Sequence, residues 1–349
     1  GIRLMAIIDK PSDYFNTVIY TGNAGTQSIT GVGFSPDFIW GKNRSSVTHH
    51  ALVDTVRGNT KYVKSSTNAA EATITNMVTA FGSDGFSLGA DSDMNGSSAN
   101  QVAWNWKAGT SFTNDASATG IGSIDSTGSV NTDAGFSIIS YTGTASAATV
   151  AHGLGAVPKM IIVKTRGSSG DWSVYHSSLG NTKNLKLNTT AAEQTSASYW
   201  NNTTPTSSVF TINDEGNVNG SSVAMIAYCF AEKQGYSKFS SYSSNSNADG
   251  PFVYLGFKPA FLIVKCTTAA EGWAIMDSTR EPTNDGSFAT LSANTNGSEG
   301  SLVIDFLSNG FKPRQVSGQI NKSGSHSYIF MAFASNPLVT STGVPATAR

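Results

Sequence analysis

The side chains best suited to acid–base chemistry in this 349-residue sequence are two aspartates, Asp54 and Asp277. Each has an arginine three residues further on, and His176 stands at the matching position of an intervening segment. Acid–base catalysis needs two carboxyl groups in one cleft, with environments that separate their pKa values. A catalytic group would not tolerate replacement by histidine in one copy of a shared scaffold. The pattern therefore favours a structural ion pair or a turn cap over catalysis.

A second acidic pattern, Asp91-x-Asp93-x-Asn95, matches the first half of a calcium-binding loop. A complete loop would place a glutamate where this sequence has Val102. The counterpart segment at 215–220 is poor in acids and also ends in Asn-Gly. We therefore predict a turn that precedes a strand, and we keep a weak calcium site formed by Asp91, Asp93 and Asn95 as the alternative.

The histidines and cysteines give no pattern typical of a metal or redox site. His49 and His50 are adjacent, but neighbours on a strand point to opposite faces and would not share a zinc ion. Alignment of recurring segments places His50 where tryptophans stand elsewhere, which favours packing. Cys229 and Cys266 lie in apolar runs and are predicted to be buried free thiols. With no phosphate-binding glycine–lysine loop and no serine-nucleophile motif, we expect no cofactor and no catalytic residue.

Aromatic side chains that could stack on sugars form the last class of candidate. Most aromatic residues lie in apolar, strand-like runs and are expected to belong to the core. Tyr199 and Trp200 differ, because they form a pair within the polar stretch 196–204. They are the candidate ligand-facing aromatics.

The elements that position these side chains are predicted to be strands. Charged residues make up only 13% of the chain, the formal net charge is −1, and 35 residues are glycine. This composition argues against a nucleic-acid partner, and no apolar run reaches the roughly 18–20 residues of a membrane span. Asp9 and Lys10 interrupt the first apolar stretch, so we expect no signal peptide. Short runs rich in β-branched and aromatic residues, separated by Gly, Asn, Asp and Pro, are typical of an all-β protein.

An internal repeat organises most of the chain. In three segments a proline is followed, six residues later, by a lysine: Pro36 to Lys42, Pro158 to Lys164 and Pro259 to Lys265. A tyrosine precedes each proline at a similar distance: Tyr20, Tyr141 and Tyr242. Twelve residues after each lysine lie Asp54, His176 and Asp277. These spacings predict three tandem β-sandwich, jelly-roll-like repeats of about 100 residues each.

The repeat spacing divides the chain into six segments. They are an N-terminal arm (1–13), repeats at 14–108, 135–234 and 235–337, a Gly/Ser/Thr-rich linker (109–134) with one short strand near 121–124, and a C-terminal tail (338–349). Two capping-box patterns, at 68–71 and 190–193, are expected to remain polar loops with at most one helical turn. Asn-Gly pairs at 95–96 and 219–220 are expected to provide turns with positive φ.

Several longer motifs extend the comparison beyond spacing. The first copy has Tyr-Thr-Gly-Asn at 20–23, the segment 29–44, Asp-Gly-Phe-Ser-Leu-Gly at 84–89 and Trp-Asn-Trp-Lys-Ala at 104–108. This combination resembles a repeat in structural proteins of marine tailed phages, cyanophage-like ones included, which are described as tail-fibre-like or virion proteins. The second copy matches at 135–143 and 152–155, and the third departs most. The resemblance implies a particle component without enzyme activity.

We therefore expect a non-enzymatic structural protein of a phage virion, in the tail, a fibre or the surface decoration. It would self-associate, with a trimer favoured, and dock on other tail or capsid proteins through its terminal arm and tail. A low-charge surface suits assembly in salt, which screens ion pairs. The alternative is a carbohydrate-binding adhesin that recognises a host surface glycan through Tyr199 and Trp200. A glycan-degrading enzyme is the least favoured hypothesis.

Overall fold

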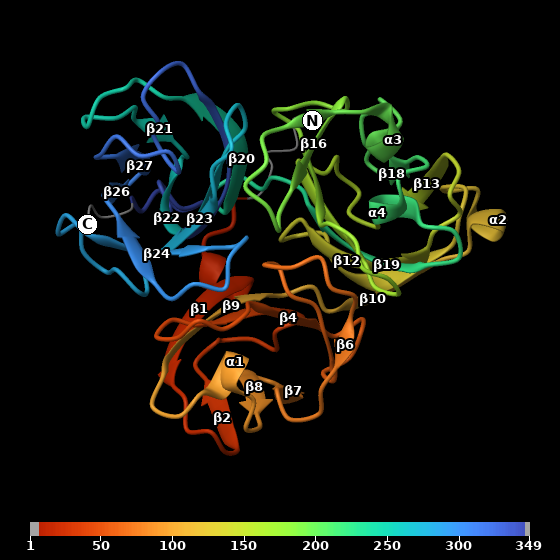
Figure 1. The fold of residues 1–349 in the computed structure, drawn as a ribbon, viewed down its shortest axis with the longest axis horizontal. Helices are drawn as coiled ribbons and strands as arrows, with labels where there is room; N and C mark the ends of the chain where they lie inside the picture. The colour runs from red at the N-terminus through yellow and green to blue at the C-terminus, as the bar shows by residue number, and fades with distance from the viewer. Residues whose placement is uncertain (1–6, 346–349) are drawn as a thin grey trace.

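Three β lobes surround a common centre in the computed structural model, which describes residues 7–345 (Figure 1). Lobe one is drawn in red and orange, lobe two in yellow and green, and lobe three in teal and blue. Their strands fall within residues 15–106, 110–230 and 237–337. All paired strands of these lobes run antiparallel, which confirms the predicted all-β class.

Each lobe has an inner sheet whose four main strands follow the same order. In lobe one these are β1 (Phe15–Thr21), β9 (Asn100–Trp106), β3 (Phe38–Asn43) and β4 (Ala51–Asp54). In lobe two they are β12 (Phe136–Thr142), β19 (Ala224–Phe230), β14 (Met160–Thr165) and β15 (Ser173–His176). In lobe three they are β20 (Ser237–Ser243), β28 (Ser327–Pro337), β22 (Phe257–Cys266) and β23 (Trp273–Asp277). The shared order supports the three-repeat hypothesis.

Smaller elements complete each lobe. Outer sheets are formed by β2 (Gln27–Thr30), β8 (Gly85–Leu88) and β7 (Val78–Gly82), by β13 (Ala148–Ala151) and β18 (Val209–Ile212), and by β21 (Val253–Tyr254), β27 (Gly310–Pro313) and β26 (Ile304–Leu307). Further short strands are β5 (Lys61–Tyr62), β6 (Ala72–Thr73), β16 (Lys183–Lys186), β17 (Gln194–Thr195), β24 (Phe288–Ser292) and β25 (Gly300–Leu302). The short helices are η1 (Pro11–Asp13), α1 (Ser92–Asn95), α3 (Ala197–Trp200) and α4 (Gly216–Asn219).

The inner sheets are apolar on both faces because each face meets a different core. On β14, Met160 and Ile162 pack into a core shared by all three lobes, whereas Ile161 and Val163 pack into the core of lobe two. Successive strand residues point to opposite faces, so a continuous apolar run is what such a strand requires. All residues of Met160–Thr165 and of the segment 261–266 are accordingly buried.

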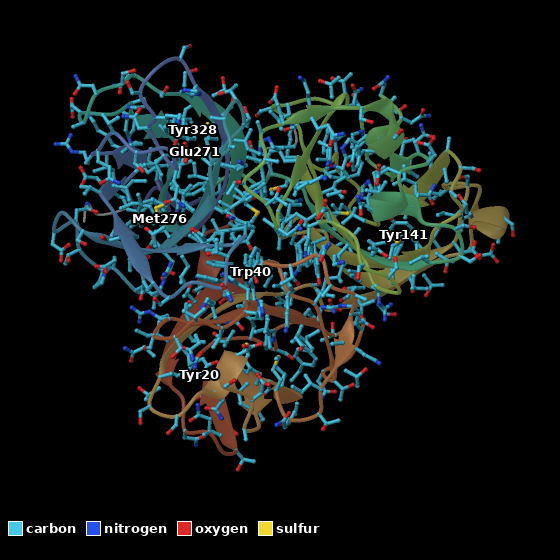
Figure 2. All side chains as sticks on the ribbon, viewed as in Figure 1. Tyr20, Trp40, Tyr141, Glu271, Met276 and Tyr328 are labelled. Carbon is cyan, nitrogen blue, oxygen red and sulfur yellow. The ribbon has the colours of Figure 1, made fainter. Side chains whose placement is uncertain are left out.

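Equivalent turns hold the outer end of each lobe. The three tyrosines that precede the repeated prolines donate from their hydroxyl groups to backbone carbonyls at 2.6–2.8 Å. The pairs are Tyr20 to Met94, Tyr141 to Val218 and Tyr242 to Ile320. Figure 2 labels Tyr20 and Tyr141 in their lobes. A buried asparagine next to each carbonyl accepts a hydrogen bond from the turn after β1, β12 or β20: Asn95 from Asn23 N, Asn219 from Thr144 N and Asn321 from Asn245 N.

The predicted linker at 109–134 is instead part of lobe two. Strands β10 (Thr110–Asn114) and β11 (Ser126–Asn131) add to the inner sheet beside β12, with α2 (Ala116–Thr119) between them. The strand expected near 121–124 is absent, and Ile124 forms only an isolated bridge with Val150. β10 is an edge strand that pairs through its backbone and is mostly exposed, so its polar sequence carries little strand signal.

Two local predictions had different outcomes. The capping-box segments at 68–71 and 190–193 form no helix, as expected. The Asn-Gly prediction is wrong: the φ angles of Gly96 and Gly220 are −58° and −57°, and positive φ occurs two residues later, at Ser98 and Ser222. The asparagines are used for their side-chain amides rather than for turn conformation.

Candidate functional site

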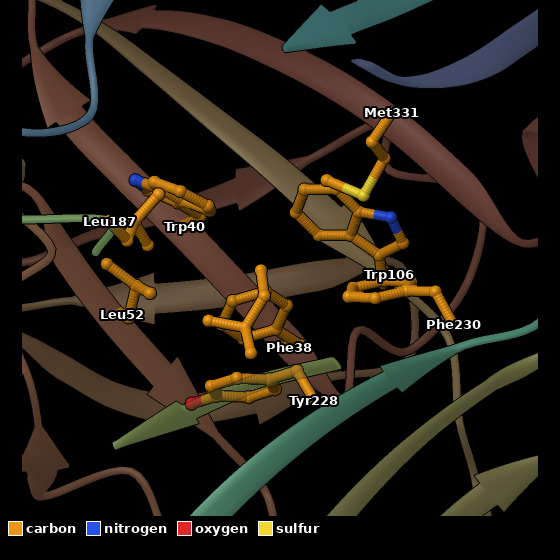
Figure 3. A pocket seen from close by; sticks show the side chains of 9 residues that line it. Phe38, Trp40, Leu52, Trp106, Leu187, Tyr228, Phe230 and Met331 are labelled. Carbon is orange, nitrogen blue, oxygen red and sulfur yellow. The ribbon is translucent and has the colours of Figure 1, made fainter. Parts of the chain in front are cut away.

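The meeting point of the three lobes is a closed apolar core. Phe38 of lobe one stacks on Tyr228 of lobe two with ring centroids 4.4 Å apart, and Trp106 lies 5.6 Å from Phe261 of lobe three. Figure 3 shows this packing around Phe38, Trp106 and Met331. The space between the nine lining side chains is too small to hold a water molecule. The centre of the molecule is therefore packed and is not a ligand cavity.

Asp54 lies at the contact between lobes one and two, which we call seam one–two. Its carboxylate accepts hydrogen bonds from Arg57 Nε at 2.6 Å and from Arg57 N at 2.9 Å. It also accepts one from the Tyr228 hydroxyl of lobe two, at 2.8 Å. Both members of the Asp54–Arg57 pair are fully buried. The expected structural ion pair and turn cap are thus confirmed, with a contact across the seam in addition.

Asp277 has the same role at seam three–one. Its carboxylate pairs with the buried Arg280 and accepts a hydrogen bond from Trp104 Nε1 of lobe one at 2.9 Å. The Arg280 guanidinium also lies over the Trp104 ring, 5.4 Å from its centroid. Asp54 and Asp277 therefore both join neighbouring lobes.

His176 replaces the aspartate at seam two–three and is uncharged. Its Nε2 lies 3.1 Å from the backbone carbonyl of Phe330 in lobe three, and its Nδ1 accepts from Ser178 N at 3.2 Å. Burial lowers the pKa of His176 to about 4. A neutral imidazole suits this place because Leu179 stands where the other two lobes have arginine.

A ring of glutamates forms a second set of contacts between the lobes. The backbone N–H groups of Glu71, Glu193 and Glu299 donate to carbonyls of the next lobe, on Arg166, Thr267 and Arg44, at 2.8–3.0 Å. At two seams the side chains also pair: Arg166 donates two hydrogen bonds to Glu71, and Arg44 Nε lies 2.6 Å from Glu299. At seam two–three Glu193 pairs within its own lobe, with Lys183.

Ring nitrogens make a third set of contacts. Trp172 Nε1 donates to Lys64 O, and Trp273 Nε1 to Lys186 O, both at 2.9 Å. His50 takes the tryptophan position at seam three–one, with Nε2 3.1 Å from Ser292 O. Its Nδ1 accepts from Trp40, so Nε2 carries the proton. The predicted packing role of His50 is therefore confirmed.

The lysines that follow the three prolines by six residues, Lys42, Lys164 and Lys265, are buried. Lys164 Nζ donates to Asn68 O of lobe one and Gly170 O, and Lys265 Nζ donates to Thr190 O of lobe two and Glu271 O. Lys42 instead binds carbonyls of its own loop. Burial lowers the pKa of each of these lysines to about 8. The lysines therefore hold loops in place, and two of them also join lobes.

The calcium candidates are separated by local hydrogen bonds. Asp91 caps α1 by accepting from Asp93 N, and Asp93 accepts from His49 N at 3.2 Å. The Asn95 amide donates to Asn23, Gly25 and Gly89. Each of the three side chains therefore has hydrogen-bond partners within the fold, and a short helix replaces the expected simple turn. Within residues 7–345, no group of three or more His, Cys, Asp or Glu residues could hold a metal.

Tyr199 and Trp200 are buried, which corrects their prediction as ligand-facing aromatics. Only 2% and 1% of their surfaces are exposed, and both belong to the core of lobe two. The capped turn α3 directs them inward, although the sequence around them is polar. Cys229 and Cys266 are buried free thiols, as predicted. No helix in the described part of the chain is long and apolar enough to cross a membrane.

The fold and its seams define a class of protein: an all-β chain in which three lobes close around one core. Within this class, the chain belongs to the family described as domain of unknown function DUF7483, whose model matches residues 10–337. The match spans all three lobes as one unit. The chain has no match among curated proteins.

Proposed function

We propose that this protein is a non-enzymatic structural component of a bacteriophage virion, in the tail, a fibre or the surface decoration. The observation that carries the proposal is the use of the recurring polar residues. Asp54, Asp277 and His176, the best candidates for chemistry, are all buried in contacts between lobes. This use of polar residues for internal packing suits a structural subunit, and the resemblance to phage structural repeats favours a phage particle as its place.

Self-association and docking on other tail or capsid proteins are part of this proposal. The chain already closes three lobes around its own core, so a homotrimer would have to use outer surfaces. In the described part of the arm, Ile8 N donates to Gln234 O in the connection between lobes two and three, and in the tail Leu338 N donates to Gly256 O of lobe three. Asp9 also accepts a hydrogen bond from Ser341 N at 2.7 Å, so the arm and the tail touch each other.

The test is to locate the protein in purified phage particles. Mass spectrometry should detect it in stoichiometric amounts, and a density map should accommodate the three-lobed unit at a repeated position. Its absence from particles would overturn the virion role. Sedimentation of the isolated protein would test the favoured trimer separately, and hydrolysis of host polysaccharide by the purified protein would overturn the non-enzymatic proposal.

A further inference from the structure

Lobe three carries two aromatic rings on its surface. Phe252 and Tyr254 are 48% and 57% exposed, and they are the aromatic members of the exposed large hydrophobic residues within 7–345. They lie at β21, the edge strand of the outer sheet β21–β27–β26. Their spacing of two residues places them on one face, while Val253 between them points into the core of lobe three. The sequence pattern therefore leaves both rings on the outside.

Each ring lies beside a glycine. A Cβ atom on Gly310, the residue opposite Tyr254, would come within 3.0 Å of the Phe252 ring. A Cβ atom on Gly256 would lie 3.7 Å from the Tyr254 ring and 3.5 Å from its hydroxyl oxygen. The rings therefore lie close to the backbone at these two positions, and each leaves about half of its surface open. A sugar ring stacks on an aromatic face of this kind.

Charged side chains border the rings on the same face. Lys312 stands opposite Asp305 on β27 and β26, and its Nζ lies 2.9 Å from Asp249. Arg314 pairs with both aspartates. All four side chains remain 24–64% exposed, so they can exchange hydrogen bonds with ligand hydroxyl groups. The two carboxylates and the two cationic side chains give this face no net charge, which favours a neutral ligand over a polyanion.

We infer that this face, defined by Phe252, Tyr254, Lys312 and Asp305, binds a neutral glycan. The two rings together expose roughly 200 Å² of apolar surface, judged from the usual area of aromatic side chains. A stable protein interface needs about 800 Å² per partner, so the patch suits a few sugar units better than a second protein. The inference is independent of the virion role, which does not require this face.

Affinity electrophoresis in gels that contain dextran, galactomannan, laminarin or the acidic polymer alginate tests the inference. At least one neutral polysaccharide should retard the protein. The double variant Phe252→Ala/Tyr254→Ala should weaken that retardation roughly tenfold, which corresponds to about 1.4 kcal/mol. Tyr254→Phe, which keeps the ring, should bind within about twofold of the unmodified chain. Val47→Ala, at another exposed apolar site, should bind normally.

Four outcomes would overturn the inference. Three are no retardation by any neutral polymer, equal retardation of the double variant, and binding of alginate alone. The fourth is a change in sedimentation caused by the double variant, which would assign the face to contacts between copies instead. Thermal unfolding must stay unchanged in the double variant, as expected for exposed rings. Particles that incorporate this variant would show that any loss of glycan binding is separate from the structural role.

Discussion

Seam one–two and seam two–three use the same backbone frame with different side chains. Seam one–two has a buried carboxylate, Asp54, satisfied by Arg57 and by Tyr228 from the next lobe. Seam two–three has one neutral imidazole, His176, that contacts a backbone carbonyl. The glutamate contact to the next lobe's backbone is present at both, but only seam one–two adds an arginine to it. The frame therefore tolerates either charge or neutrality, provided that each buried polar group has a partner.

The largest effect should come from removing one member of a buried pair. Arg57→Met leaves the Asp54 carboxylate buried with too few donors, and should lower the free energy of unfolding by about 3–5 kcal/mol. Leu179→Met, at the matching position of lobe two, should cost under about 1.5 kcal/mol because size and polarity are kept. Urea unfolding measures both. Equal losses would show that the charge at seam one–two has no special role.

Acidification should weaken seam two–three through His176. The folded state holds His176 at a pKa of about 4, against about 6.5 when unfolded, so the unfolded chain takes up the proton first. Stability present above pH 6.5 is therefore lost as the pH falls toward 4, by about 3 kcal/mol from this residue.

The variant His176→Gln isolates this contribution, because glutamine can donate and accept without titrating. Its stability should fall less steeply between pH 6.5 and 4 than that of the unmodified protein. His326→Gln, outside the seams, serves as the control. Parallel curves for His176→Gln and the unmodified chain would contradict the assignment. The buried His50 and His152, whose pKa values burial also lowers, should keep some slope in every variant.

A moderate effect is expected from the indole contacts. Trp273→Phe and Trp172→Phe keep an aromatic ring but leave Lys186 O and Lys64 O without their indole donors. Each should lower the free energy of unfolding by about 1–3 kcal/mol, and by similar amounts. Thermal unfolding compares them directly. A much larger loss at one seam would mean that the shared frame is not energetically equivalent at the two places.

The smallest effect concerns the partly exposed Arg166–Glu71 pair. Arg166→Thr gives seam one–two the residue found at seam two–three and should cost about 0.2–1 kcal/mol. The reverse change, Thr267→Arg, should add a similar amount. Both effects should shrink in 1 M salt, because the electrostatic screening length is then only about 3 Å. Salt-independent differences would show that packing, rather than charge, separates the two seams.

Spacing within the sequence predicts much of each lobe but little of how the lobes meet. The prolines, lysines and tyrosines that recur at matched spacings mark corresponding strands and turns in the three lobes, because local sequence periodicity reflects secondary structure. The partner of Asp54 lies 174 residues away, and no local pattern indicates that contact. Sequence context also misplaced Tyr199 and Trp200, since polar neighbours can surround a turn whose aromatic side chains face inward. The exposed pair at 252 and 254 was missed because its alternation covers only three residues.

The hydrogen bonds between Asp9 and Ser341 have a practical consequence for engineering. Because these two positions are neighbours in space, a short peptide could reconnect them, and new ends could be opened in a loop between lobes. A circularly permuted chain of this kind would keep every lobe intact but would change which pair of lobes has no direct covalent connection.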